Sequence, residues 1–250
     1  MKRLLLTVMC VCLALSAVCA EDAPRTERLP DEVLMTYYDR SIFAGDSLVL
    51  GFRGYVRSEQ QQDPAFFAGI TFFGVASYQL RAAAVENVNG VGTQLKYKGR
   101  DTTLAHIMEK EQPRRVFIFA GLNDRIHAFI DRADDYVNRI MALRDKFAPE
   151  TEICFFTLTP VGKKVGAKRQ KLHDEYNAWL AQKCAEVGAV CIDIASPLKG
   201  EDGMLPNEIS SDKEYHLNAK GNAVWARTLL DFAQSRYEAG LWTPEETAAR

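Results

Sequence analysis

The sequence predicts an α/β protein in which helices cover both faces of a parallel sheet of five strands. Two observations support this class: apolar runs alternate along the chain with helical patterns, and the runs are continuously apolar. Continuous apolar runs are typical of strands buried on both faces, and strand–helix alternation is typical of parallel sheets. The chain has 250 residues, of which 47% are hydrophobic and 26% charged, and it can form one large or two small globular domains.

Five apolar runs predict the strands, and helical patterns lie between them. The strands are expected at 41–44, 70–73, 115–120, 153–158 and 190–194. The first three strands end at Gly45, Gly74 and Gly121, and Pro160 closes the fourth. The helices are expected at about 75–84, 101–111, 130–147, 168–187 and 218–237. Because crossovers between parallel strands are right-handed, the loops after the strands gather at one edge of the sheet, where ligands bind.

The first 20 residues are typical of a secretory signal peptide. Lys2 and Arg3 precede an apolar run from Leu4 to Val18, and small residues lead to Ala20. This run is shorter than the ~20 residues that a membrane span needs. We therefore expect cleavage after Ala20, export to the periplasm or the exterior, and no stable membrane insertion afterwards. The remaining regions are expected as a linker or helix at 21–39, the main domain at 40–237 and a polar tail at 238–250.

Charge and cysteine content exclude several function classes. The net charge is −2, and nucleic acid is not an expected partner, because affinity for phosphates comes mostly from clustered Lys and Arg. After cleavage only Cys154, Cys184 and Cys191 remain, and they form either one disulfide and a free thiol or three buried thiols. Their spacing matches no zinc pattern, and we expect neither a metal nor a cofactor.

Two loops at the expected edge carry residues suited to acyl-transfer chemistry. Ser47 stands in Gly-Asp-Ser-Leu at 45–48, between a buried strand and a helix, where a serine can be an exposed nucleophile. Asp46 and Ser47 also suit a helix cap. Asn123 stands in Gly-Leu-Asn-Asp at 121–124 and could donate its amide protons to a carbonyl oxygen, although Asn and Asp are also common in turns.

A backbone donor and a base complete the candidate set. The N–H of Gly74, after the second strand, could stabilise charge that develops on the substrate oxygen. Gly90 and Gly92 resemble a hairpin turn but remain alternatives for that role. His216 lies in a polar loop between the last strand and the last helix, which returns it to the edge that carries Ser47. A histidine there can accept the serine proton and later deliver it to the leaving group.

These three blocks, in this order, resemble the SGNH (GDSL) hydrolase family over about residues 40–235. The resemblance implies a flavodoxin-like three-layer α/β/α fold and ester chemistry without a metal. It also implies Ser47 as nucleophile, Gly74 and Asn123 as oxyanion donors, and His216 as base. Further support in these blocks is expected from Asp46, Gly121 and Asp124.

The last block departs from the family pattern, which is normally Asp-x-x-His. Lys213 stands three residues before His216, and Asp212 stands four before it. One possibility is that the loop has an extra residue and Asp212 still reaches His216. The other is that the enzyme uses a Ser–His dyad. We favour Asp212, with Glu214 as a more distant alternative.

The sequence therefore predicts an exported serine esterase that removes a short acyl group, such as acetyl, from a carbohydrate or cell-envelope substrate. Its partner would be a small-molecule or polysaccharide ester, and the oligomeric state is left open. The alternatives are an O-acyltransferase to a sugar hydroxyl and a non-catalytic glycan-binding protein of the same fold. Residues 53–68 are expected as a long polar loop or lid. The sequence also has a run of basic residues after the fourth strand, for which two roles are open: a solvated helix face or a contact surface for an anionic polymer. This run consists of Lys163, Lys164, Lys168, Arg169 and Lys171.

Overall fold

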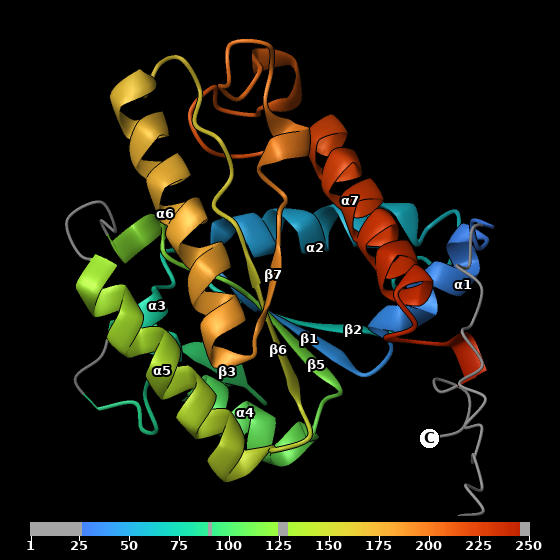
Figure 1. Ribbon diagram of the computed structural model, residues 1–250, viewed down its shortest axis with the longest axis vertical. Helices are drawn as coiled ribbons and strands as arrows, with labels where there is room; N and C mark the ends of the chain where they lie inside the picture. The colour runs from blue at the N-terminus through green and yellow to red at the C-terminus, as the bar shows by residue number, and fades with distance from the viewer. Residues whose placement is uncertain (1–26, 90–91, 125–129, 246–250) are drawn as a thin grey trace, which may run out of the picture.

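The computed structural model describes residues 27–89, 92–124 and 130–245. It confirms the predicted α/β class: five parallel strands form one sheet in the order β2-β1-β5-β6-β7, with helices on both faces (Figure 1). The arrangement is the three-layer α/β/α sandwich that the family resemblance implied. The expected signal peptide and its cleavage site lie outside the described residues.

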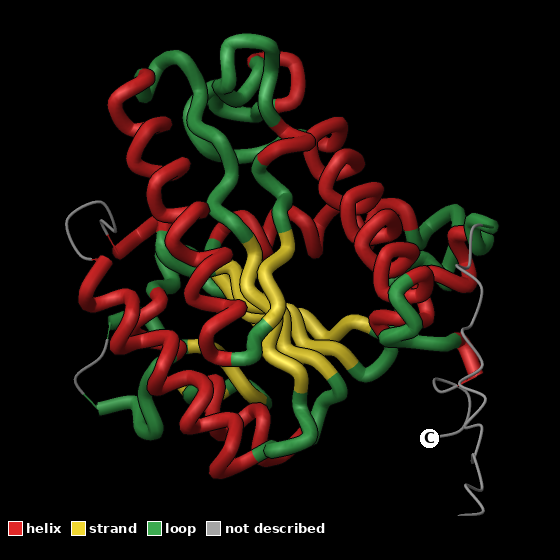
Figure 2. The backbone as a smooth tube through the Cα atoms, viewed as in Figure 1, coloured by secondary structure: helices red, strands yellow, loops and turns green. Residues whose placement is uncertain are grey.

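The strands lie where the apolar runs predicted them. They are β1 (Ser41–Gly45), β2 (Ile70–Gly74), β5 (Arg115–Phe119), β6 (Glu152–Phe156) and β7 (Val190–Ile192). The strand β7 is two residues shorter than expected, because the Asp193 side chain accepts a hydrogen bond from the Ala195 N–H at 2.9 Å and turns the chain. Figure 2 shows the long loops after β6 and β7 rising from the same end of the sheet.

The helices form two layers around the sheet. They include α1 (Asp31–Met35), α2 (Ser47–Glu59) and α7 (Ala219–Glu238) on one face, and α4 (Leu104–Glu111), α5 (Ile130–Phe147) and α6 (Ala167–Val187) on the other (Figure 1). Among the described residues, no helix is both long enough and apolar enough to cross a bilayer.

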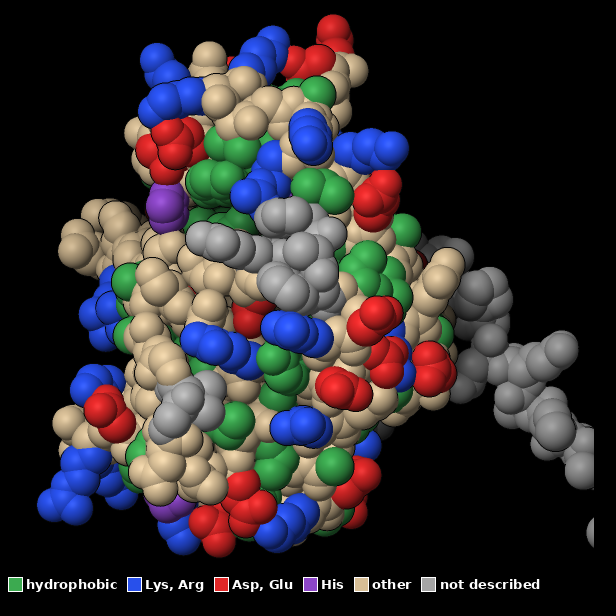
Figure 3. All heavy atoms as spheres, turned by 90° about the vertical axis from the view of Figure 1, so that its left-hand side faces the viewer, with side chains coloured by type: hydrophobic (Ala, Val, Ile, Leu, Met, Phe, Trp, Pro, Cys, Tyr) green, Lys and Arg blue, Asp and Glu red, His purple; other side chains and the backbone are tan. Residues whose placement is uncertain are grey.

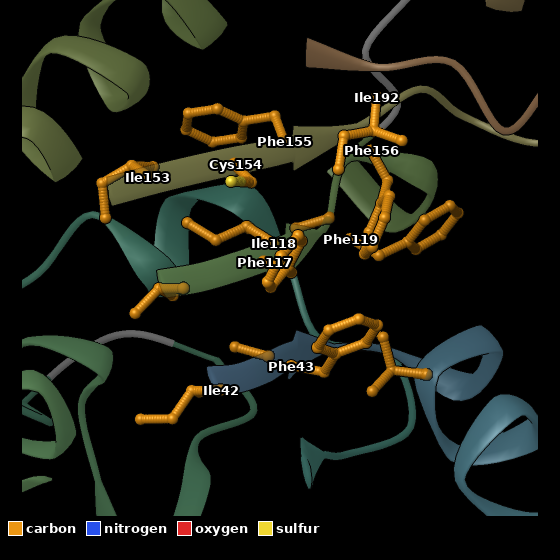
Figure 4. Packing of buried hydrophobic residues seen from close by; sticks show 14 of the residues in the cluster. Ile42, Phe43, Phe117, Ile118, Phe119, Ile153, Cys154, Phe155, Phe156 and Ile192 are labelled. Atoms are coloured by element: carbon orange, nitrogen blue, oxygen red, sulfur yellow. The ribbon is translucent and has the colours of Figure 1, made fainter. Parts of the chain in front are cut away.

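Aromatic side chains from neighbouring strands hold the sheet to the α2 and α7 layer. The ring of Phe43 on β1 lies 4.7 Å from the ring of Phe117 on β5 and 5.4 Å from that of Phe156 on β6. Trp225 on α7 stacks on Phe52 of α2 at 4.8 Å. All five side chains are buried, and Figure 4 shows the packing of the strand residues. Burial of this kind contributes roughly 1.5–3 kcal/mol for each large side chain.

Three expected elements differ from the structure. The helix expected at 75–84 is reduced to α3 (Leu80–Ala83), because a turn at 75–78 places Ser77 at φ 61°. The helix expected at 101–111 starts at Leu104, after a hairpin of β3 (Leu95–Tyr97) and β4 (Arg100–Thr102). The polar segment 53–68 is helical through Glu59, because Phe52 and Val56 extend the buried face of α2.

The expected polar tail contains a core residue. Trp242 is only 1% exposed, and its ring lies 5.3 Å from that of Tyr37, nearly perpendicular to it. The helix α7 also continues through Glu238, one residue into the expected tail. Trp242 therefore joins the start of the tail to the layer that α1 and α7 form.

Replacing Trp242 with alanine should lower the free energy of unfolding by about 3–5 kcal/mol, because a buried aromatic side chain leaves a cavity. Leu241 is the matched control, since it is 58% exposed. Leu241→Ala should change the free energy of unfolding by less than about 0.5 kcal/mol. Urea unfolding followed by fluorescence and circular dichroism measures both values. Equal effects of the two substitutions would show that the tail does not belong to the core.

Candidate active site

The position of Ser47 follows from the tight junction between β1 and α2. Asp46 caps the helix, with its Oδ1 accepting a hydrogen bond from the Leu48 N–H at 2.9 Å. A Cβ at Gly45 would lie 2.5 Å from both the Phe119 carbonyl oxygen and the Val49 side chain. Only glycine permits this approach, and the chain passes from strand to helix within one residue. Ser47 therefore stands at the carboxyl edge of the sheet as the first residue of α2.

In the structure the side chains of Ser47, His216 and Asp212 form a chain of two successive hydrogen bonds. Ser47 Oγ lies 2.9 Å from His216 Nε2, and His216 Nδ1 lies 2.5 Å from Asp212 Oδ2. With a proton on Nδ1, the imidazole donates to Asp212 and has a lone pair at Nε2 for the serine proton. This is the arrangement that activates a serine hydroxyl for attack on a carbonyl carbon.

Asp212 is held by backbone as well as by His216. Its Oδ1 accepts hydrogen bonds from the N–H groups of Glu214, Tyr215 and His216 at 2.8, 3.0 and 3.1 Å. Partial burial acts to raise the pKa of Asp212, but the hydrogen bonds from His216 and the backbone outweigh it and hold this pKa well below its usual range. The carboxylate therefore stays charged at neutral pH.

The extra residue in this block is Lys213, which adopts a left-handed conformation with φ 62°. This conformation lets the five residues from Asp212 to His216 form one tight turn. The alternative acid, Glu214, points its carboxylate to an ion pair with Lys164 instead. Of the possibilities that the sequence leaves open, the geometry favours Asp212 as the partner of His216.

Asn123 is linked to the nucleophile's helix through Asp46. Its Nδ2 donates to Asp46 Oδ2 at 2.9 Å and to the Tyr78 carbonyl oxygen at 3.2 Å. Asp46 is fully buried, and this burial raises its pKa to about 7, against the opposing effects of the Leu48 N–H and of His216. The longer bond, to Tyr78, is the one that a substrate oxygen could replace.

The backbone N–H of Gly74 does not point in the direction that a hydrogen-bond donor to the substrate oxygen requires. The Val75 N–H donates to the Gly45 carbonyl oxygen at 3.0 Å. Because successive N–H groups of a strand point to opposite sides, the Gly74 N–H points away from β1, towards the open edge of the sheet. A Cβ at Gly74 would lie 2.9 Å from Leu50 Cδ2, so this glycine lets α2 pack closely on β2.

The turn after Gly74 holds a residue that the sequence analysis missed. Ser77 is exposed and has φ 61°, and it directly precedes Tyr78, whose carbonyl oxygen contacts Asn123. Its N–H is thus a further candidate donor close to the site. Serine rarely adopts a positive φ, and nothing in the sequence indicated this conformation.

The other expected residues support the loops. Asp124 Oδ2 accepts a hydrogen bond from the Leu80 N–H at 2.7 Å and so caps α3. Gly121 has φ 125°, and its carbonyl oxygen accepts from the Asp124 N–H at 3.2 Å, which forms the turn that carries Asn123. Gly92 lies beside the side chains of Gln79 and Arg81, and Gly90 lies outside the described residues.

Ion pairs neutralise much of the basic run. Lys163 pairs with Asp202 at 2.8 Å, and Lys164 pairs with Glu214. Figure 3 shows basic and acidic side chains next to each other on this side of the molecule. A third lysine, Lys171, lies 3.7 Å from Glu175, so carboxylates offset part of the positive charge of the run.

The described residues contain no disulfide and no metal-binding cluster. Cys154 and Cys184 are buried free thiols, and Cys191 is a half-buried free thiol. No group of three or more His, Cys, Asp and Glu side chains in 27–89, 92–124 and 130–245 could hold a metal ion.

Comparison with known proteins gives one family and one fold. The model of the GDSL-like lipase/acylhydrolase family matches residues 43–224. A structure from Streptococcus pneumonia, provisionally described as a platelet activating factor, is 16% identical with a TM-score of 0.56, and the match covers 81% of this chain and 92% of that one.

Two acetyl xylan esterases also have this fold. One, from Geobacillus stearothermophilus, is 18% identical with a TM-score of 0.51 over 77% of this chain and 93% of that one. The other, AlAXEase, is 16% identical with a TM-score of 0.53 over 77% of this chain and 98% of that one. A search of curated protein sequences finds no match.

Proposed function

The chain belongs to the GDSL-like lipase/acylhydrolase family and is an ester hydrolase, and we propose that it acts through an acyl-enzyme on Ser47. The observation that carries this proposal is the line of contacts from Ser47 Oγ to His216 Nε2 at 2.9 Å and from His216 Nδ1 to Asp212 Oδ2 at 2.5 Å. A binding protein has no need of this line, whereas a serine nucleophile requires a base that a carboxylate orients.

In the first half of the reaction, Ser47 Oγ attacks the ester carbonyl carbon and His216 Nε2 takes the hydroxyl proton. The new C–O bond converts the carbonyl oxygen into an oxyanion. When this intermediate collapses, the bond to the leaving alkoxide breaks and His216 gives its proton to the alkoxide. In the second half, His216 takes a proton from water as the water oxygen attacks the acyl carbon. The bond from this carbon to Ser47 Oγ then breaks, His216 returns the proton to Ser47 Oγ, and the carboxylic acid leaves.

The oxyanion requires donors that face it before the reaction begins. Asn123 Nδ2 is one donor, held in position by Asp46 and able to exchange its 3.2 Å bond to the Tyr78 carbonyl oxygen for one to the substrate. The family resemblance implied Gly74 as the backbone donor, but the direction of its N–H does not fit that role. The Ser77 N–H replaces it in our proposal.

The substrate class that we propose is an acetylated carbohydrate outside the cytoplasm. The signal-peptide pattern of residues 1–20 supports export. The likeness in fold to two acetyl xylan esterases supports a short acyl group on a sugar. Hydrolysis, and not transfer to a second sugar, is the simpler reaction because water needs no acceptor site.

The purified chain 21–250 should hydrolyse p-nitrophenyl acetate, with a kcat/KM about tenfold or more above that for the octanoate ester, if the site accepts a short acyl group. Acetylated xylo-oligosaccharides should release acetate, measured by chromatography. A fluorophosphonate that labels serine nucleophiles should add one group, on Ser47. Absence of both hydrolysis and labelling would contradict the proposed chemistry, and acetylation of an added sugar in preference to acetate release would show a transferase.

A further inference from the structure

The acid and the base of the site stand at the two ends of one short turn. The Ser211 N–H donates to the His216 carbonyl oxygen at 2.9 Å and closes this turn. The left-handed Lys213 within it accommodates the additional residue. Hydrogen bonds to Asp212 Oδ1 hold the turn together internally. These bonds set its shape, but its distance from Ser47 depends on the surface against which it lies.

That surface is the loop after β6, and the point of contact is Gly162. The Gly162 N–H donates to the Glu214 carbonyl oxygen at 2.7 Å. A Cβ at Gly162 would overlap the Lys213 carbonyl oxygen and lie 2.6 Å from its carbonyl carbon and 3.1 Å from the Glu214 nitrogen. The Lys213–Glu214 peptide thus lies directly on the Gly162 backbone, where any side chain would displace it.

The loop beneath the turn is itself anchored. The Val161 N–H donates to Gln170 Oε1 on α6 at 2.8 Å, and the Val161 carbonyl oxygen accepts from the Leu205 N–H at 2.9 Å. His173, also on α6, lies with its Nδ1 2.9 Å from the Thr159 carbonyl oxygen. Val161 and His173 are buried. A side chain at position 162 would therefore move the turn more readily than the loop.

We propose that Gly162 is a positioning residue for the Asp212–His216 pair. Because Gly162 has no side chain, the turn from Asp212 to His216 can pack directly on its backbone. In this position His216 Nε2 is within hydrogen-bond distance of Ser47 Oγ, and Asp212 Oδ2 is within hydrogen-bond distance of His216 Nδ1. The proposal rests on the proposed function of this site. It also accounts for an Asp-x-x-x-His block, because the longer turn needs a flat backbone surface to support its extra peptide.

Gly162→Ala should lower kcat for p-nitrophenyl acetate by about 100-fold and leave KM within about threefold, because a shift of about 1 Å in a catalytic group has an effect of this size. A proton NMR signal far downfield of the amide region, from the short His216 Nδ1–Asp212 hydrogen bond, should be present in the unsubstituted protein and lost in Gly162→Ala. A purely structural role would lower thermal stability but leave kcat per folded molecule and this signal unchanged.

Gly54→Ala is the matched control, because a Cβ at this exposed position of α2 meets nothing within 4 Å. It should keep kcat and the NMR signal. If Gly162→Ala does not fold, the same substitution is made in a Lys213→Gly parent, whose more flexible peptide can yield. There the added methyl group should still lower kcat about tenfold relative to that parent, because the yielding turn shifts less than about 1 Å.

The outcomes separate this proposal from the proposed function. If the unsubstituted protein neither hydrolyses the ester nor reacts with the fluorophosphonate, the proposed function fails and this inference fails with it. If it does both, and a folded position-162 variant keeps kcat within threefold of its parent together with the downfield signal, only the role of Gly162 is overturned.

Discussion

Ser47→Ala is expected to lower kcat for ester hydrolysis by more than ~1000-fold, because loss of the nucleophile removes covalent catalysis and leaves only binding and oxyanion stabilisation. The side chain is the first of α2, and its Oγ contacts His216 Nε2 at 2.9 Å. The cap of this helix is Asp46, not Ser47, so the substitution should leave the helix in place. The measurement is initial-rate kinetics on p-nitrophenyl acetate, with fluorophosphonate labelling followed by mass spectrometry.

Ser58→Ala provides the control on the same helix. Ser58 is exposed on the last turns of α2, and its substitution should change neither kcat nor labelling. Thermal unfolding should show the same cooperative transition in both variants. A Ser47→Ala protein that keeps more than a tenth of the kcat would mean that another group attacks the ester.

Ser47, Asn123 and His216 could be proposed as site residues from the sequence because local features mark all three. Ser47 and Asn123 each stand within four residues of the end of a continuous apolar run, and His216 lies in a polar segment just before a helical pattern. In a parallel sheet the loops after the strands meet at one edge, so the order of elements alone brings such residues together. The five strands were predictable for the same reason, since burial on both faces leaves a continuous apolar signal.

Gly74 and Ser77 show what the sequence could not provide. Whether an N–H faces the site depends on strand register, and the pairing of Gly45 with Gly74 turns the Gly74 amide outwards. Ser77 carries a positive φ that its residue type does not indicate. The sequence predicts a polar tail around Trp242, although this side chain packs on Tyr37, more than two hundred residues earlier in the chain. Long-range contacts and backbone direction leave no local pattern.

Asp212→Asn is expected to lower kcat by about 10³–10⁴-fold, the second large effect. The asparagine Oδ1 can still accept the backbone N–H groups of Glu214, Tyr215 and His216 that now bind Asp212. Its NH2 group would then face His216 Nδ1 and favour the tautomer in which Nε2 carries the proton. That imidazole donates to Ser47 Oγ and cannot take its proton, so catalysis falls while the fold remains.

Glu214→Gln is the matched control, since it neutralises a second carboxylate in the same turn. The Glu214 side chain pairs with Lys164, away from His216, and its substitution should leave kcat within about threefold, as an exposed ion pair contributes little. If Glu214→Gln abolishes activity and Asp212→Asn does not, Glu214 is the acid. If neither matters, the enzyme works with a Ser–His dyad.

The pH dependence of stability gives an independent reading of Asp212. Its pKa in the folded protein lies below the usual value because of the hydrogen bonds from His216 and the backbone, which outweigh partial burial. A lowered pKa means that the charged carboxylate stabilises the fold above the ordinary carboxyl pKa of about 3.9, and that this contribution is lost as the pH falls through the folded value. Asp212→Asn should therefore lower the Tm at pH 7, and the difference should shrink steadily below pH ~4. A Tm difference that does not depend on pH would mean that the charge of the Asp212 carboxylate does not stabilise the turn. A loss of kcat in Asp212→Asn would then be assigned to a change in the shape of the turn and not to the wrong tautomer of His216.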